Sequence, residues 1–161
     1  MSPEVQDDVV ALAGRMLDAS GAKDVDVSWF GGEPLLAPDV IEPLSARLMA
    51  LAEERGGEYS ASIITNGYLL TQDIVDMLAA AKVRSAQVTI DGMGAAHDAT
   101  RRLAGGGPTF ERITSNLRRL KIPFRVNVRH NVHELSWSVT LLCGWNHAHV
   151  GSLFAIVPLS L

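Results

Sequence analysis

The feature that most constrains the fold of this chain is a regular alternation of strand patterns with helix patterns. Short β-rich runs predict strands over residues 25–30, 59–64, 86–90, 124–128 and 149–157. Apolar periodicity predicts helices over residues 3–18, 38–55, 71–82, 109–120 and 134–143. Strands that alternate with helices of this length form a parallel sheet with right-handed crossovers. The sequence therefore predicts an α/β fold in a single domain over residues 1–161.

Local signals set the expected ends of these helices. Ser2, Thr71 and Thr109 are expected N-caps, and Pro43 is expected to remove one hydrogen bond near the start of its helix. The segment from Asp91 to Pro108 is expected to be a loop. One face of the first helix is expected to carry its apolar side chains: Val5, Val9, Leu12 and Met16.

Each predicted strand ends in a polar or glycine-rich turn. These turns are Gly31–Pro34, Thr65–Gly67, Asp91–Gly92 and Asn127–Asn131. In parallel α/β folds the carboxyl ends of the strands lie at one edge, and ligands bind there. The four turns therefore predict a composite ligand site.

Composition excludes several classes of function. The chain has 161 residues with 18 acidic and 14 basic side chains, so its net charge of −4 excludes a strongly basic nucleic-acid surface. No apolar run reaches the roughly 18 residues of a membrane span, and no export signal precedes the first helix, which predicts a cytoplasmic protein without a membrane partner. The single cysteine, Cys143, excludes a disulfide framework. The oligomeric state is left open.

Two further motifs have features of a binding site. Gly105–Gly107 lacks the Lys-Ser or Lys-Thr that follows a phosphate-binding loop, which favours an ordinary loop. Cys143 and the nearby histidines match no zinc spacing, so no metal site is predicted from this chain's residues.

Several motifs, taken in order, resemble one known family. Residues 29–36 read Trp-Phe-Gly-Gly-Glu-Pro-Leu-Leu, residues 64–67 read Ile-Thr-Asn-Gly, and residues 88–92 read Val-Thr-Ile-Asp-Gly. His97-Asp98-x-x-Arg101, Gly107–Phe110, Arg125–Val128 and Asn131 follow. This series resembles the radical S-adenosylmethionine (SAM) enzymes, in the branch of anaerobic sulfatase-maturing and related SPASM peptide-modifying enzymes. The likeness covers about residues 3–133, and residues 134–161 are either a sixth βα unit or an altered tail.

The resemblance implies a partial (β/α)6 TIM-like barrel that binds SAM at its rim. Glu33 and the adjacent glycines would meet the methionine ammonium, and Arg101 would meet the SAM carboxylate, with its neighbour Arg102 in solvent or the two arginines reversed. The alternatives to cofactor binding are purely structural: a tight turn with a solvated Glu33, a Thr89 that favours the strand, and loop-ordering roles for His97 and Asp98. The residues that the resemblance assigns to cofactor binding are Gly31, Gly32, Glu33, Pro34, Asn66, Thr89, Asp91, Arg101 and Asn127.

One departure from the family is severe. Its enzymes hold a 4Fe–4S cluster on three cysteines that follow the first strand, and they act, in this branch, on a peptide or protein substrate. This chain opens with a helix and contains only Cys143, so the first strand and its cluster loop are expected to be missing. Three interpretations follow: an inactive fragment of a radical SAM enzyme, a non-catalytic module that binds a small molecule or peptide at the same rim, or an unrelated doubly wound domain.

Overall fold

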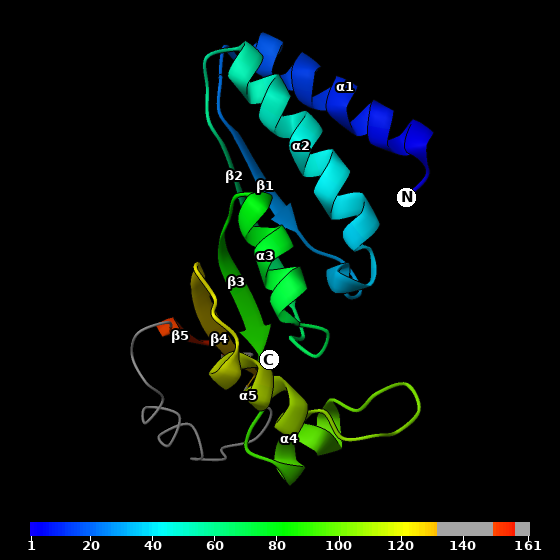
Figure 1. Ribbon diagram of the computed structural model, residues 1–161, viewed down its shortest axis with the longest axis vertical. Helices are drawn as coiled ribbons and strands as arrows, with labels where there is room; N and C mark the ends of the chain where they lie inside the picture. The colour runs from blue at the N-terminus through cyan, green and yellow to red at the C-terminus, as the bar shows by residue number, and fades with distance from the viewer. Residues whose placement is uncertain (132–149, 157–161) are drawn as a thin grey trace, which may run out of the picture.

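The computed structural model describes residues 1–131 in full and the backbone of residues 150–156. The sequence-predicted helix over 134–143 lies outside the described residues. The elements in chain order are α1 (Pro3–Ser20), β1 (Val25–Trp29), η1 (Pro34–Leu36), α2 (Pro38–Glu54), β2 (Tyr59–Thr65), α3 (Gln72–Ala80), β3 (Val83–Thr89), α4 (Ala95–Thr100), α5 (Phe110–Arg119), β4 (Arg125–Asn131) and β5 (Val150–Ile156) (Figure 1).

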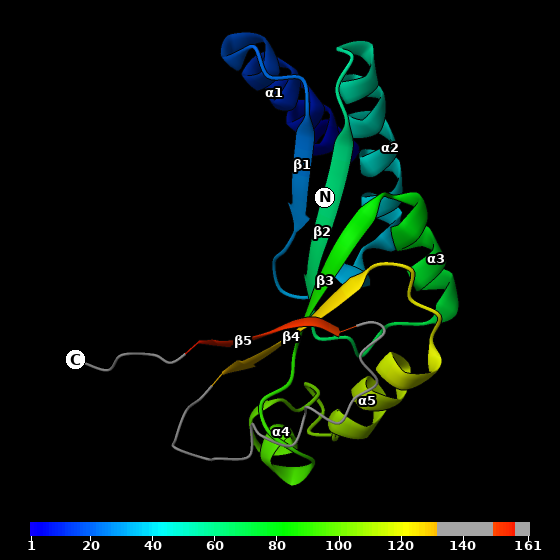
Figure 2. The same ribbon diagram turned by 90° about the vertical axis from the view of Figure 1, so that its left-hand side faces the viewer.

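The described strands form one parallel sheet. Its strand order is β1-β2-β3-β4-β5, so each strand pairs with the next one in the chain. Figure 2 shows α2, α3 and α5 on the same side of this sheet. A doubly wound domain reverses its strand order and carries helices on both faces. Sequential order with helices on one face instead matches a partial (β/α) barrel, which confirms the expected fold class.

The two faces of the sheet differ in polarity. In β2 the buried residues Tyr59, Ala61, Ile63 and Thr65 alternate with more exposed ones, as the period of two in a strand requires. Of these, Tyr59, Ala61 and Ile63 join a core with Leu44, Leu78 and Ile113. On the other face, the hydroxyl of Ser60 donates to the Asp26 carboxylate at 2.6 Å. The helix-covered face therefore supplies the apolar core.

The first helix packs on a different face from the one expected. Val5, Leu12 and Met16 are exposed, with 46%, 50% and 63% of their surface accessible. Of the four expected residues Val9 does pack against the core, together with Val10 and Ala13, and Leu17 is buried. Ion pairs from Arg47 to Asp7 and from Arg55 to Asp18 hold α1 beside α2 in this orientation. The hydrophobic periodicity was right, but it did not decide which apolar stripe meets α2.

The segment after Asp91 was expected to be a loop and contains a short helix, α4. Sequence patterns miss it because six residues are too few to show a helical period. Thr109 precedes α5 as expected, yet its side chain makes no capping bond. Asp98 caps the helix instead, because its Oδ1 accepts the N–H groups of Thr109 at 2.7 Å and Phe110 at 2.9 Å. This confirms the local structural role predicted for Asp98.

The turn between α2 and β2 has no room for a side chain at Gly57. A Cβ there would lie 2.1 Å from the carbonyl oxygen of Lys23. We expect Gly57→Ala to lower the free energy of unfolding by about 1–3 kcal/mol, the usual cost of overpacking. Gly105→Ala is the matched control, because a Cβ there would meet nothing within 4 Å. Urea denaturation measures both, and equal stability of the two variants would contradict this account.

Candidate ligand site at the carboxyl ends of the strands

The loop after β1 brings free backbone carbonyls to the rim of the sheet. Gly31 adopts a φ of +130°, a conformation that residues with a Cβ rarely adopt, and open space surrounds both Gly31 and Gly32. Among the described residues, the carbonyl oxygens of these two glycines accept no hydrogen bond. Two unused carbonyls in open space are suited to a ligand that donates hydrogen bonds, such as an ammonium group.

Glu33 ties the end of β1 to the end of β2. Its Oε1 accepts the Thr65 hydroxyl at 2.6 Å and the Leu35 N–H at 3.1 Å, and its Oε2 accepts the Asn66 N–H at 2.8 Å. Pro34 follows as the first residue of η1. The Glu33 carboxylate therefore has three protein donors, and the solvated side chain considered in the sequence analysis is not what the structure contains.

Asp91 joins the end of β3 to the end of β4. Its Oδ1 accepts the Asn131 N–H at 2.8 Å, its Oδ2 accepts the Asn131 side-chain amide at 3.3 Å, and the Arg101 guanidinium pairs with Oδ2 through Nε. Burial alone would raise the pKa of Asp91. The Asn131 N–H and the Arg101 charge outweigh that effect and leave the pKa of Asp91 below its ordinary value.

His97 fixes the turn that follows β3. The Asp91 N–H donates to His97 Nδ1 at 3.1 Å, so Nδ1 is unprotonated and Nε2 carries the ring proton. Nε2 lies 3.1 Å from the Thr109 hydroxyl, which donates to the Arg101 carbonyl at 2.5 Å. Burial lowers the pKa of His97 below its ordinary value of 6.5. A neutral, fully buried imidazole therefore orders this loop.

Thr89 and Asn127 sit on adjacent strands with unused polar atoms. Thr89 is 7% exposed, and its hydroxyl makes no hydrogen bond within the described part of the chain. The Asn127 side-chain oxygen is buried and has no partner among residues 1–131. A buried acceptor without a partner is costly, so each such group calls for an explanation. A bound ligand that donates a hydrogen bond would supply one for Asn127.

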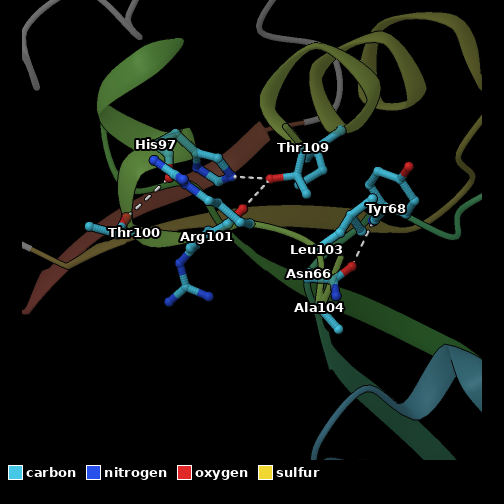
Figure 3. Close-up of a pocket in the computed structure, with 10 residues that line it drawn as sticks. Asn66, Tyr68, His97, Thr100, Arg101, Leu103, Ala104 and Thr109 are labelled. Carbon is cyan, nitrogen blue, oxygen red and sulfur yellow. Dashed lines mark hydrogen bonds between the residues drawn. The ribbon is translucent and has the colours of Figure 1, made fainter. Parts of the chain in front are cut away.

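A cavity of about 370 Å³ opens beside Arg101 (Figure 3). Asn66 and Tyr68 line it from the β2–α3 connection, and Thr100, Arg101 and Arg102 line it from the segment around α4. The lining contains two arginines and no carboxylate. Figure 3 shows the Arg101 guanidinium extending away from His97 and Thr109. The cavity is therefore suited to a small ligand with an anionic group.

The structure places the nine sequence-predicted residues in two settings. Glu33, Asp91 and the Asn66 side-chain oxygen, which accepts the Tyr68 N–H at 2.8 Å, are occupied by protein donors. The residues with unused atoms or open surroundings are Gly31, Gly32, Thr89, Arg101 and Asn127. Pro34, the ninth residue, belongs with the structural group, because it is the first residue of η1. Sequence reasoning did not single out Tyr68 as a site residue, and its place directly after the Thr65–Gly67 turn was the only available signal.

Fold and site together define a partial parallel α/β barrel with a ligand site at the carboxyl ends of its strands. The sequence profile of the Radical SAM superfamily matches residues 3–132. The chain belongs to this superfamily.

Curated relatives and solved structures agree with this assignment. AdoMet-dependent heme synthase from Methanosarcina barkeri is 39% identical over 113 residues, which is 66% of this chain and 30% of the relative. The enzyme of the same name from Nitratidesulfovibrio vulgaris is 32% identical over 132 residues, which is 80% of this chain and 34% of that protein. The chain thus spans about a third of the length of these relatives.

The solved structures that resemble the chain support the fold. A native anaerobic sulfatase-maturating enzyme, anSMEcpe, with bound AdoMet superposes with a TM-score of 0.61 at 22% identity, over 80% of this chain and 35% of that one. Its complex with AdoMet and the Kp18Cys peptide gives a TM-score of 0.60 at 23% identity, with the same coverage. At this level of identity the likeness establishes a shared architecture.

The residues present fit one of the family's two cofactors. Free carbonyls at Gly31 and Gly32, the free hydroxyl of Thr89 and the exposed Arg101 guanidinium are complementary to the ammonium, hydroxyl and carboxylate groups of SAM. The 4Fe–4S cluster does not fit, because it needs three cysteines and the whole chain has one. Among the described residues, no group of three metal-ligating side chains occurs and no helix is long and apolar enough to cross a membrane.

The buried His97 predicts a pH-dependent stability. The unfolded chain takes up a proton at His97 as the pH falls below about 6.5, whereas burial holds the folded imidazole neutral. The contribution of His97 to the free energy of unfolding should therefore be constant above pH 6.5. Below that pH the free energy of unfolding should decrease as the pH falls. Urea denaturation at pH 7.5 and 5.5 measures the decrease. The His97→Gln variant should be less stable but show a smaller decrease, and an unchanged decrease would refute the assignment.

Proposed function

We propose that this chain is the SAM-binding part of a radical SAM enzyme. The observation that carries the proposal is that the free Gly31 and Gly32 carbonyls, Thr89 and Arg101 all lie at or just after the carboxyl ends of strands in one parallel sheet, in a chain whose sequence matches the superfamily. AdoMet bound to structures of the same architecture supports it. A cytoplasmic location remains part of the proposal.

The nine predicted residues divide into two roles in this proposal. The Gly31 and Gly32 carbonyls accept the methionine ammonium, Arg101 binds the carboxylate, and Thr89 and Asn127 contact the remainder of the ligand. Glu33, Pro34 and Asn66 hold the loops that carry these groups, and Asp91 supports Arg101 through their ion pair, in agreement with their occupied side chains or their place in η1.

In this proposal the chain does not ligate the 4Fe–4S cluster. Its residues bind and orient SAM, and the three cysteines of the family must come from polypeptide outside these 161 residues. We therefore propose that the chain alone is inactive in SAM cleavage. A non-catalytic module that binds SAM at the same rim would behave identically on its own.

Two substrate classes have support. The relatives above 30% identity are named heme synthases, which favours a tetrapyrrole related to heme. The sequence motifs resemble the peptide-modifying branch, and one anSMEcpe structure holds a peptide, which favours a peptide or protein substrate. We give the tetrapyrrole priority, because the curated relatives match at higher identity than the peptide-bound structure does.

Calorimetry with purified chain tests the proposed function. We expect SAM to bind, and Arg101→Ala to weaken the binding about tenfold or more, because a charge-assisted hydrogen bond contributes about 1.5–3 kcal/mol. Arg47→Ala is the control, since Arg47 pairs with Asp7 on α1 and lies outside the cavity lining. Absence of binding by the wild-type chain at millimolar SAM would overturn the proposal.

The substrate class is tested by spectroscopy. An iron porphyrin with carboxylate side chains should shift its Soret absorption when titrated with the chain in the presence of SAM. A labelled peptide should give no change in fluorescence anisotropy under the same conditions. The opposite result would transfer the assignment to the peptide class.

A further inference from the structure

The Asp91 carboxylate is buried and fully occupied by protein donors. Its side chain is 5% exposed. Oδ1 accepts the Asn131 N–H, while Oδ2 receives both the Asn131 side-chain amide and Arg101 Nε. A carboxylate in this setting has little capacity to bind a ligand, although the sequence motif had placed it among the cofactor contacts.

Arg101 uses only part of its guanidinium in this ion pair. The contact to Asp91 involves Nε, and the two terminal nitrogens make no hydrogen bond to residues 1–131. The side chain is 36% exposed and lines the cavity of about 370 Å³. A planar guanidinium held along one edge still offers a second edge, with geometry that matches a carboxylate.

From these contacts we infer that Asp91 is a positioning residue, which acts on the ligand only through Arg101. An unrestrained arginine has a large rotamer entropy, and fixing it before binding removes that cost from the affinity. Asn131 fixes Asp91 in turn, because its N–H donates to the Asp91 carboxylate from β4 while Arg101 approaches from the end of α4. The inference rests on the proposed SAM site. It makes Asp91 a determinant of the site's selectivity for ligands that carry a carboxylate.

The neighbouring arginine provides an internal comparison. Arg102 lines the same cavity, but its Nε donates to the Asp98 carbonyl at 2.9 Å and it has no carboxylate partner among the described residues. The two arginines thus share a cavity and differ in whether Asp91 holds them. Any effect of Asp91 that passes through Arg101 should persist when Arg102 is removed.

The test compares SAM with decarboxylated SAM on the full chain. The wild-type chain should prefer SAM, and Asp91→Asn should reduce this preference about tenfold while leaving the affinity for decarboxylated SAM unchanged. In the Arg101→Ala background, Asp91→Asn should have no further effect on the preference. In the Arg102→Ala background, it should retain its full effect. Circular dichroism establishes that each variant is folded.

The outcomes separate the inference from the function on which it rests. If wild-type chain binds neither ligand, the proposed SAM site is wrong and the inference is overturned with it. If wild-type chain prefers SAM and Asp91→Asn keeps that preference, the inference alone is overturned. Equal weakening of both ligands, in both arginine backgrounds, would mean that Asp91 merely stabilises the loop. Should Asp91→Asn fail to fold, Asn131→Ala is the milder variant, with a smaller loss of preference expected.

Discussion

The end of a parallel strand leaves backbone N–H groups without partners in the sheet, and this protein satisfies them with carboxylates from neighbouring turns. Glu33, after β1, accepts the Asn66 N–H that follows β2. Asp91, after β3, accepts the Asn131 N–H at the end of β4. Buried backbone donors need such partners, and each acceptor here comes from the turn after an adjacent strand. The rim is therefore a set of pairwise links between strand ends.

These links separate residues that build the site from residues that remain available to a ligand. Because Glu33 and Asp91 are occupied, the free groups are backbone carbonyls at Gly31 and Gly32 and the terminal nitrogens of Arg101. The loop after β3 needs further support, which the neutral ring of His97 and the capping carboxylate of Asp98 provide. Acidic side chains thus stabilise a site whose cavity lining has no acidic residue.

The chain carries the groups that suit only one of the two cofactors of its superfamily. The chain belongs to the Radical SAM superfamily and spans about a third of the heme synthases and of the anSMEcpe chains that it resembles. The described sheet carries the groups that suit SAM, whereas the cysteines that suit the cluster are absent from the sequence. The residues of this chain therefore suit the binding and orientation of SAM, and they do not suit ligation of the cluster.

The sequence by itself determined the order of the strands and longer helices, the parallel sheet and the turns that carry the site, because periodicity and turn residues are local properties, but it missed the six-residue α4. It also predicted the cap at Ser2 and the structural role of Asp98. Only the tertiary structure decided that α1 turns Val10, Ala13 and Leu17 inward and leaves Leu12 exposed, since several apolar stripes compete and packing against α2 selects among them. It likewise decided that Asp91 meets Asn131, because that contact joins residues 40 positions apart and depends on the adjacency of β3 and β4.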